Sequence, residues 1–403
     1  MMPESGKGLL TAIALATSLG MASPAAAQQI GVDDDNKVVT VGAFTPVTGP
    51  VPFYAILTHA AEAFYRHLND NGGIEGWTVR YVTLDDGYDP ARSVAVTRQL
   101  VEDEGIFALS AAVGTAPNVA VIPFASEVGL PMIGPIGGAS AFFTAANIFP
   151  LLPDYGWSAA SNVDYAVNDL GLKKIALLWE NDELGRSAKR GFDLYMEHLG
   201  LEPAESVPFD VSTTNFSAHI RRVANSGAEA VILFGSNANL AAALKAADLQ
   251  GLDVEWFAPF FAADPSTFRL AGDLLNGVHF SSWLVPVTSD DPQVAAYREA
   301  VGKYYPDDPV GVFGLNGWSN AALFAEGFRA LLASGNELTR ENLIAALDGL
   351  KDASVGGAQG VSFQPGDHRG TRQEGIIQAQ EGEFVLVREF RPYPEVVFDA
   401  KTE

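Results

Sequence analysis

Residues 112–124 read AVGTAPNVAVIPF, so a glycine and a threonine directly follow an apolar run. Gly114 allows the backbone to pass close to a ligand, Thr115 offers a hydroxyl group, and Pro117 fits the first turn of a helix. The free N–H groups at such a helix start attract an anion such as a carboxylate. The alternative is that Thr115 only caps the helix. Pro123, further along the segment, is expected to kink or split this helix.

A second turn between a strand and a helix contains two glycines, in the stretch PIGGAS at 135–140. It lacks the lysine that follows the glycines of a phosphate-binding P-loop, and its glycine spacing is not that of a dinucleotide-binding fingerprint. A nucleotide site is therefore disfavoured, and we expect no cofactor.

The sequence offers few patterns that are typical of catalysis or metal binding. The six histidines are scattered, and neither a His-Glu-x-x-His zinc pattern nor a Gly-x-Ser-x-Gly nucleophile turn occurs. The absence of cysteine excludes disulfides, thiolate metal sites and a cysteine nucleophile. Glu180 and Asp182 could do acid–base chemistry, although any acidic chain contains such pairs by chance. Asp85 and Asp86 could accept hydrogen bonds from a ligand or only shape the start of a helix. We expect neither enzyme activity nor a metal site.

The 403 residues carry a formal net charge of −24, which argues against nucleic acid, because phosphate binding needs a basic face. Residues 1–27 have the pattern of a cleaved secretory signal peptide: a basic residue, a short apolar stretch and small residues before the cleavage point. No later segment is apolar for long enough to insert into a bilayer. We therefore expect a soluble protein, exported to the periplasm and without a lipid anchor.

Apolar runs that predict strands alternate along the chain with segments of helical periodicity. The expected strands of a first series are 38–44, 77–84, 106–113 and 130–135. A second series begins near residue 173 and closes near residue 260. Such alternation is typical of parallel sheets with right-handed crossovers, and two series predict an α/β fold of two doubly wound lobes.

The loops that follow these strands are the expected place for a ligand, because ligands of open α/β sheets bind beyond the carboxyl ends of the strands. The rule selects loops at 45–54, 85–86, 114–115, 135–140, 180–182, 235–239 and 259–261. Two lobes that face each other through these edges would enclose a cleft, a common place for small-molecule sites.

Five stretches carry a resemblance to a known family: VGAFTPVTGP (41–50), NGGIEGWTVRYVTLDDGYDPARSVAVTRQLV (71–101), GTAPNVAVIPFASEVGLPMIGP (114–135), ENDELGRSAKRGF (180–192) and GVSFQPGDHRGTRQ (360–373). In their order and spacing they resemble the solute-binding proteins of ABC importers in the branched-chain amino acid (Leu/Ile/Val) branch. That family has the type I periplasmic-binding fold, and the likeness covers essentially the whole chain after residue 27.

The resemblance implies two lobes joined by three crossings, which would close around a ligand by hinge motion. The crossings are expected near 151–156, 279–284 and 368–374. The N-terminal lobe would comprise 38–153 and 281–370, and the C-terminal lobe 154–280 and 371–403.

The resemblance also implies where a ligand is held. In the family, a Ser or Thr and backbone amides after the third strand bind the ligand carboxylate, which corresponds to Gly114 and Thr115. An aromatic residue in the first loop corresponds to Tyr54. The next loop corresponds to Gly137 and Gly138, where relatives that bind amino acids often carry a threonine. That hydroxyl group is missing here.

A second departure concerns the ligand's other end. In relatives that bind amino acids, a glutamate in the far lobe binds the ammonium group, and Phe260 takes its place here. A buried ammonium without a partner costs about 3–5 kcal/mol, so a simple α-amino acid is disfavoured. Phe260, Phe261 and Tyr54 instead suit an apolar or aromatic carboxylate. The alternative is that both phenylalanines belong to the core and the alignment is displaced by one or two positions. Asn237 completes the expected site.

The resemblance thus implies a monomeric periplasmic binding protein that delivers a small carboxylate-bearing ligand to the membrane permease of an ABC importer. Two other functions stay open at this point. One is a periplasmic sensor module that signals to a receptor, and the other is an exported hydrolase or isomerase that uses carboxylates in the cleft.

Overall fold

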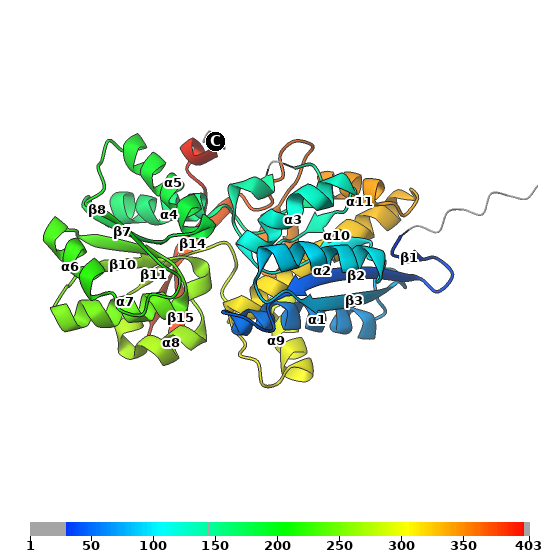
Figure 1. Ribbon diagram of the computed structural model, residues 1–403, viewed down its shortest axis with the longest axis horizontal. Coiled ribbons are helices and arrows are strands. Elements are labelled where there is room, and N and C mark those ends of the chain that lie inside the picture. Colours follow the sequence, from blue (N-terminus) through cyan, green and yellow to red (C-terminus); the bar gives the residue numbers. More distant parts are fainter. Residues whose placement is uncertain (1–29, 144, 399–403) are drawn as a thin grey trace, which may run out of the picture.

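The computed structural model describes residues 30–143 and 145–398, so the expected signal peptide lies outside the described residues. The chain forms two α/β lobes side by side, each built on its own sheet (Figure 1). The predicted fold class is therefore confirmed. Among the described residues, no helix combines the length and the hydropathy that a membrane crossing requires.

The first lobe contains a sheet in the order β3-β2-β4-β5-β6, all parallel, with β1 antiparallel to β2. Its strands are β1 (Val32–Asp33), β2 (Val38–Thr45), β3 (Thr78–Asp85), β4 (Ala108–Ser110), β5 (Met132–Ile133) and β6 (Ile148–Phe149). Its helices are α1 (Ala55–Asp70), α2 (Pro90–Glu102), α3 (Thr115–Glu127), α9 (Pro292–Tyr304), α10 (Val312–Ser334) and α11 (Arg340–Asp348). A short hairpin of β12 (Ala353–Val355) and β13 (Ala358–Val361) follows α11.

The second lobe contains a sheet in the order β15-β14-β11-β10-β9-β7-β8, in which only β14 and β15 run antiparallel to their neighbours. Its strands are β7 (Ile175–Glu180), β8 (Glu205–Phe209), β9 (Ala230–Phe234), β10 (Glu255–Ala258), β11 (His279–Ser282), β14 (Gln373–Gln380) and β15 (Glu383–Pro392). Its helices are α4 (Tyr155–Asp164), α5 (Glu183–His198), α6 (Ser217–Ser226), α7 (Asn237–Gln250) and α8 (Pro265–Ala271).

Helices cover both faces of the second sheet, and the strand sequences show why. Along β7, Ile175 and Leu177 pack into one hydrophobic cluster, whereas Ala176 and Leu178 pack into another on the opposite face. Successive side chains of a strand point to opposite faces, so a strand buried on both sides must be apolar throughout. The continuous apolar runs in the sequence therefore predicted these strands correctly.

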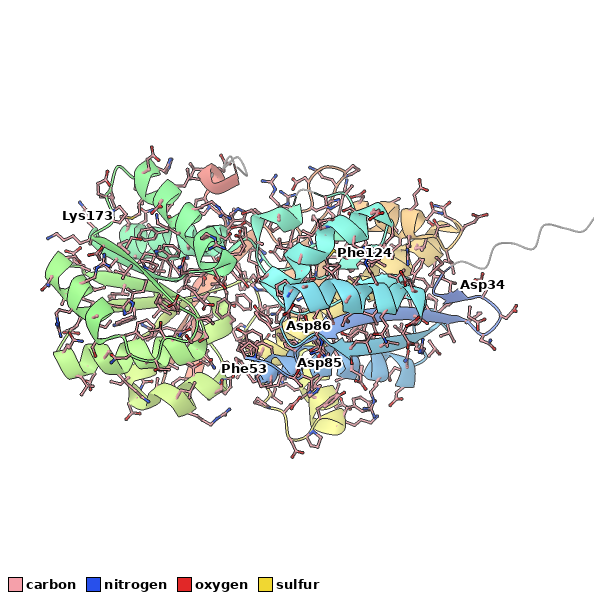
Figure 2. All side chains as sticks on the ribbon, viewed as in Figure 1. Asp34, Phe53, Asp85, Asp86, Phe124 and Lys173 are labelled. Atoms are coloured by element: carbon pink, nitrogen blue, oxygen red, sulfur yellow. The ribbon has the colours of Figure 1, made fainter. Side chains whose placement is uncertain are left out.

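The carboxyl ends of the first sheet face the second lobe. Asp85, the last residue of β3, lies at the junction of the lobes, whereas Asp34, in the turn before β2, lies at the opposite end of the first lobe (Figure 2). Loops that leave these strand ends are thus placed between the lobes, as the topology rule requires.

The chain passes between the two sheets three times: after β6, after β11 and before β14. The first passage is held by Asp154, a buried residue whose carboxylate accepts hydrogen bonds from Ser140, Ser187 and the Gly156 amide. The third lies against the first, because the Thr371 hydroxyl donates to the Leu151 carbonyl at 3.0 Å. The lobe boundaries expected from the sequence stay a prediction.

Helix α3 runs without a break through Pro123, so the expected split of the helix is wrong. Pro123 lies on the exposed side of the helix, where the carbonyl group that loses its N–H partner can bind water. Val121 and Phe124 are buried in the core beside it and hold the helix in place.

Helices α4 and α5 pack unusually closely at a pair of glycines. A methyl group built on Gly191 would overlap the backbone of Gly156. The helices can approach this closely only because neither position carries a side chain. Gly302 in α9 offers the opposite case, since a methyl group there would meet nothing within 4 Å.

We expect Gly191→Ala to destabilise the protein by about 1–3 kcal/mol, because overpacking forces the two helices apart. Gly302→Ala should stabilise it by about 0.4–1 kcal/mol, because alanine restricts the unfolded chain more than glycine does. Thermal unfolding of both variants checks this pair. Equal midpoints for the two variants would contradict the close helix contact.

Candidate ligand-binding site

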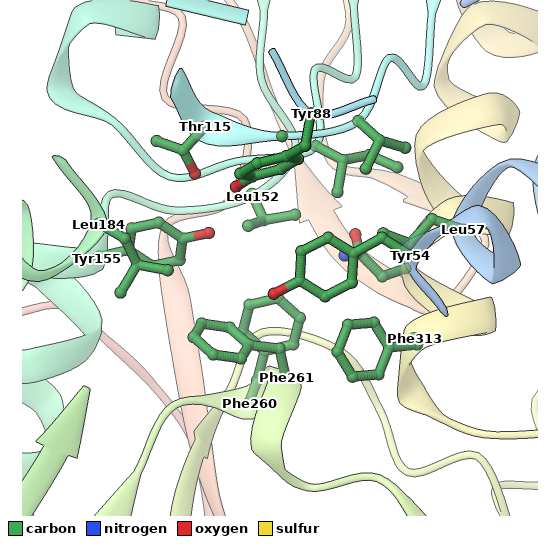
Figure 3. A pocket seen from close by; sticks show the side chains of 14 residues that line it. Tyr54, Leu57, Tyr88, Thr115, Leu152, Tyr155, Leu184, Phe260, Phe261 and Phe313 are labelled. Atoms are coloured by element: carbon green, nitrogen blue, oxygen red, sulfur yellow. The ribbon is translucent and has the colours of Figure 1, made fainter. Parts of the chain in front are cut away.

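A pocket lies between the lobes, beyond the carboxyl ends of strands from both sheets (Figure 3). Its volume is about 40 Å³, room for a few water molecules. Fourteen residues line it: Tyr54, Leu57, Tyr88, Val113, Gly114, Thr115, Ile136, Leu152, Tyr155, Leu184, Phe260, Phe261, Phe313 and Asn316. None of their side chains carries a formal charge at neutral pH, so the pocket recognises shape, hydrogen bonds and apolar surface.

The turn at Gly114 and Thr115 faces this pocket, as the sequence predicted. Gly114 has φ 111°, a conformation that favours glycine, and its amide donates to the Ile136 carbonyl at 2.9 Å. Thr115 is the first residue of α3, and no side chain caps this helix. The alternative that Thr115 only caps the helix is therefore wrong.

The amides at the start of α3 are available to a ligand. The first N–H groups of a helix have no acceptor within the helix, and Pro117 has no N–H to offer. In the described part of the chain no side chain takes their place. The N–H groups of Thr115 and Ala116, with the Thr115 hydroxyl beside them, therefore form a small cluster of donors at one side of an uncharged pocket.

Tyr88 lines the pocket but was not predicted from the sequence. Its backbone has φ 60°, and its amide donates to the Asp86 carboxylate at 3.0 Å. Asp86 is fully buried and also accepts a hydrogen bond from the Ser93 hydroxyl at 2.6 Å. A side chain at Gly114 would collide with the Tyr88 ring, so the glycine is needed for this packing.

Asp85 and Asp86 therefore bind their own chain. Asp85 accepts hydrogen bonds from the amides of Val47 and Thr48, each at 3.0 Å, and so shapes the loop that leads to Tyr54. The cap of α2 is Asp89, whose carboxylate accepts from two amides of the first turn. The acidic pair therefore shapes loops, a use that was not predicted from the sequence, and Asp89 caps the helix instead.

Gly137 and Gly138 do not line the pocket but lie directly behind its wall. A side chain at Gly137 would collide with Thr115, and one at Gly138 would collide with the Tyr155 ring. The Gly138 carbonyl also accepts the Tyr155 amide at 3.0 Å. These glycines thus set the positions of two lining residues. The sequence predicted that the glycines themselves border the ligand.

Asn237 also lies outside the pocket, because the start of α7 borders a different groove. Its side-chain amide donates to the Ser266 hydroxyl at 2.9 Å. Asn237 therefore does not lie beside Thr115, and its expected part in ligand binding stays a prediction. At the start of α7, Ser236 and Asn239 form a capping box.

Phe260 and Phe261 line the pocket from the second lobe and are also buried in the core. The two rings pack edge-to-face at 5.4 Å, and Phe260 packs on Trp283 of the second passage at 5.7 Å. Phe261 in turn packs on Tyr155 at 5.8 Å. Phe260 and Phe261 therefore belong both to the pocket wall and to the core, so the two interpretations do not exclude each other.

Comparison with protein families matches residues 38–383 to the family described as periplasmic binding protein. The chain belongs to the periplasmic binding protein family. The leucine-, isoleucine-, valine-, threonine- and alanine-binding protein of Pseudomonas aeruginosa is 25% identical over 315 residues, which cover 77% of this chain and 83% of that protein. The predicted family is confirmed, and with it the prediction of a non-catalytic binding protein.

Two solved structures show the same fold. A fatty acid ABC transporter substrate-binding protein from Thermomonospora curvata has a TM-score of 0.82 and 23% identity, covering 93% of this chain and 97% of that one. A branched-chain amino acid ABC transporter protein from Thermus thermophilus with bound valine has a TM-score of 0.83 and 22% identity, covering 90% and 98%. Because these two proteins are described with different ligands, the fold alone does not choose the ligand of this periplasmic binding protein.

Two carboxylic acids of this periplasmic binding protein lie behind the pocket wall on the side of the second lobe. Glu180 ends β7 and is buried, and Asp182 caps α5 two residues later. Burial and the neighbouring charge of Asp182 raise the pKa of Glu180 to about 8. The pair also contributes to the raised pKa values of three pocket phenols, Tyr54, Tyr88 and Tyr155, for which burial is the main cause.

The raised pKa of Glu180 makes stability depend on pH. A buried carboxyl group that holds its proton more tightly in the folded state favours folding below its unfolded pKa, near 4.5, and this contribution is lost as the pH rises toward about 8. Glu180→Gln removes the titration. We therefore expect the thermal midpoint of Glu180→Gln, relative to that of the unmodified protein, to increase as the pH rises from about 5 to about 9.

The matched control is Glu197→Gln, an exposed position on α5, the helix that follows Glu180 in the chain. Its difference from the unmodified protein should stay constant over the same pH range. A constant difference for Glu180→Gln as well would show that Glu180 does not titrate in this range.

Proposed function

We propose that this chain is an extracytoplasmic solute-binding protein that captures a small monocarboxylate between its lobes and delivers it to the permease of an ABC importer. The observation that carries the proposal is the donor cluster of the Thr115 and Ala116 amides and the Thr115 hydroxyl, at one side of an otherwise uncharged pocket that is rich in aromatic rings. A carboxylate can accept two amide hydrogen bonds and one from the hydroxyl group, and the helix dipole favours its negative charge.

These contacts are strong enough for useful binding. Hydrogen bonds to a charged group contribute about 1.5–3 kcal/mol each. Three of them with the burial of an apolar body against Phe260 and Phe261 can exceed the cost of ordering a small ligand. Micromolar affinity, about −8 kcal/mol, lies within this range.

The far side of the pocket favours a ligand with one charge. No lining side chain is an anion that could pair with a buried ammonium group, which supports an acid rather than an α-amino acid. A second carboxylate on the side of Leu184 would approach the Glu180–Asp182 pair and be repelled. Aromatic or aliphatic monocarboxylates fit both conditions.

Delivery to a permease would require the lobes to open and close. The three passages between the sheets are the places where such a rotation would occur. We place this protein in the periplasm, as a monomer, on the strength of its family and of the signal-like residues 1–27.

Thr115→Ala should weaken carboxylate binding at least several-fold, because one charge-assisted hydrogen bond is lost. Thr115→Ser keeps the hydroxyl group and should retain most of the affinity. Isothermal titration calorimetry with benzoate and with hexanoate measures both variants. If Thr115→Ala binds both acids as tightly as the unmodified protein does, Thr115 is not part of the site.

The ranking of ligands forms a separate prediction. In a thermal-shift series, benzoate and hexanoate should raise the unfolding midpoint more than leucine, isoleucine or valine at equal concentration, because the pocket lacks an anion for the ammonium group. The largest shift with leucine would reverse this ranking and restore the amino acid as the ligand class.

A further inference from the structure

A second groove opens beside the ligand pocket. Its volume is about 440 Å³, roughly ten times that of the pocket, and its walls come from both lobes. Phe53 and Ile56 contribute from the start of α1, and Leu270 contributes from α8. Figure 2 shows Phe53 at the junction of the lobes. Phe53 and Leu270 are each 42% exposed, so two large apolar side chains from opposite lobes are open to water in one groove.

The groove and the pocket share a wall at Phe313, which lines both. The Phe313 ring lies 5.8 Å from the ring of Phe53 on the groove side and 5.7 Å from the ring of Tyr54 on the pocket side. The wall that the two spaces share thus includes Phe313, and a side-chain rotation there is what a ligand would need to pass from the pocket into the groove.

The local sequence explains why the two spaces are neighbours. Around the start of α1, Tyr54 and Leu57 face the pocket, whereas Phe53 and Ile56, each one residue earlier, face the groove. Residues three apart lie on the same side of a helical turn, so the two pairs form adjacent stripes on one turn. Apolar side chains of this turn therefore continue from the pocket into the groove, whose wall on the second lobe also carries Asn237, Asp264, Ser266 and Arg269.

The donor cluster determines which way a bound ligand would point. Thr115 and Phe313 lie on opposite sides of the pocket (Figure 3). A ligand with its carboxylate on Thr115 therefore extends away from α3, toward Phe313. The alternative course toward Leu184 leads to the acids Glu180 and Asp182.

We propose that the groove binds the hydrocarbon tail of the same ligand, so that this protein selects elongated monocarboxylates over short ones. The proposal rests on the proposed function, because it needs the carboxylate at Thr115. The tail passes Phe313 and packs between Phe53 and Leu270 when the lobes close. Each methylene group that it buries should tighten binding about threefold to fourfold.

Calorimetric titration with straight-chain acids of increasing length tests this proposal. With the unmodified protein, we expect decanoate to bind at least about tenfold more tightly than hexanoate. The informative quantity is the ratio of the two dissociation constants, because it separates the tail from the carboxylate head.

Two leucine variants locate the effect. Leu270→Glu places a charge in the groove and should reduce the ratio at least about fivefold, because the tail then meets a solvated carboxylate. Leu249→Glu makes the same change on α7 at a side chain that is 86% exposed and outside the groove, and the ratio should stay as in the unmodified protein.

The outcomes separate the two proposals. If hexanoate and decanoate bind equally well, or if Leu270→Glu and Leu249→Glu show the same ratio, the groove does not bind the tail, although the proposed function stands. If neither acid binds at millimolar concentration, both proposals are overturned together.

Discussion

The close packing at Gly114 is the constraint on which the site depends. With φ 111° and no side chain, this residue lets the Tyr88 ring lie against the turn and lets α3 begin at the edge of the pocket. A methyl group there would displace both the aromatic wall and the helix start. The aromatic wall and the helix start proposed to bind an anion are therefore not independent, since one missing side chain makes both possible.

The site separates its charges from the surfaces that touch the ligand. Polar donors gather at the start of α3, aromatic rings form most of the remaining wall, and the acids Glu180 and Asp182 stand behind that wall. The acids act through space and not by contact, so they restrict which ligands are tolerated without supplying a partner. In this arrangement the surrounding charges would select ligands by their charge, whereas the apolar pocket wall would accept many shapes.

The sequence predicted the parts of the site that depend on local pattern and failed where packing decides. The turn at Gly114 and Thr115 was recognisable because a glycine between an apolar run and a helix has few other uses. Tyr88 was missed because its left-handed backbone depends on the buried Asp86, which no spacing rule reveals. That Asn237 lies apart from Thr115 was not predicted, because strand order tells which loops share an edge but not where each loop comes to lie.

The carboxylate of Asp154 joins a loop of one lobe, at Ser140, to a helix of the other, at Ser187, directly where the chain first passes between the sheets. A group at a pivot sweeps almost no arc when two bodies rotate about it. Because the bonds of Asp154 lie beside this passage, a rotation of the lobes about it would change their lengths little. Whatever holds the lobes shut must act at a long lever arm, and a guest molecule bridging the two rims is placed to do so.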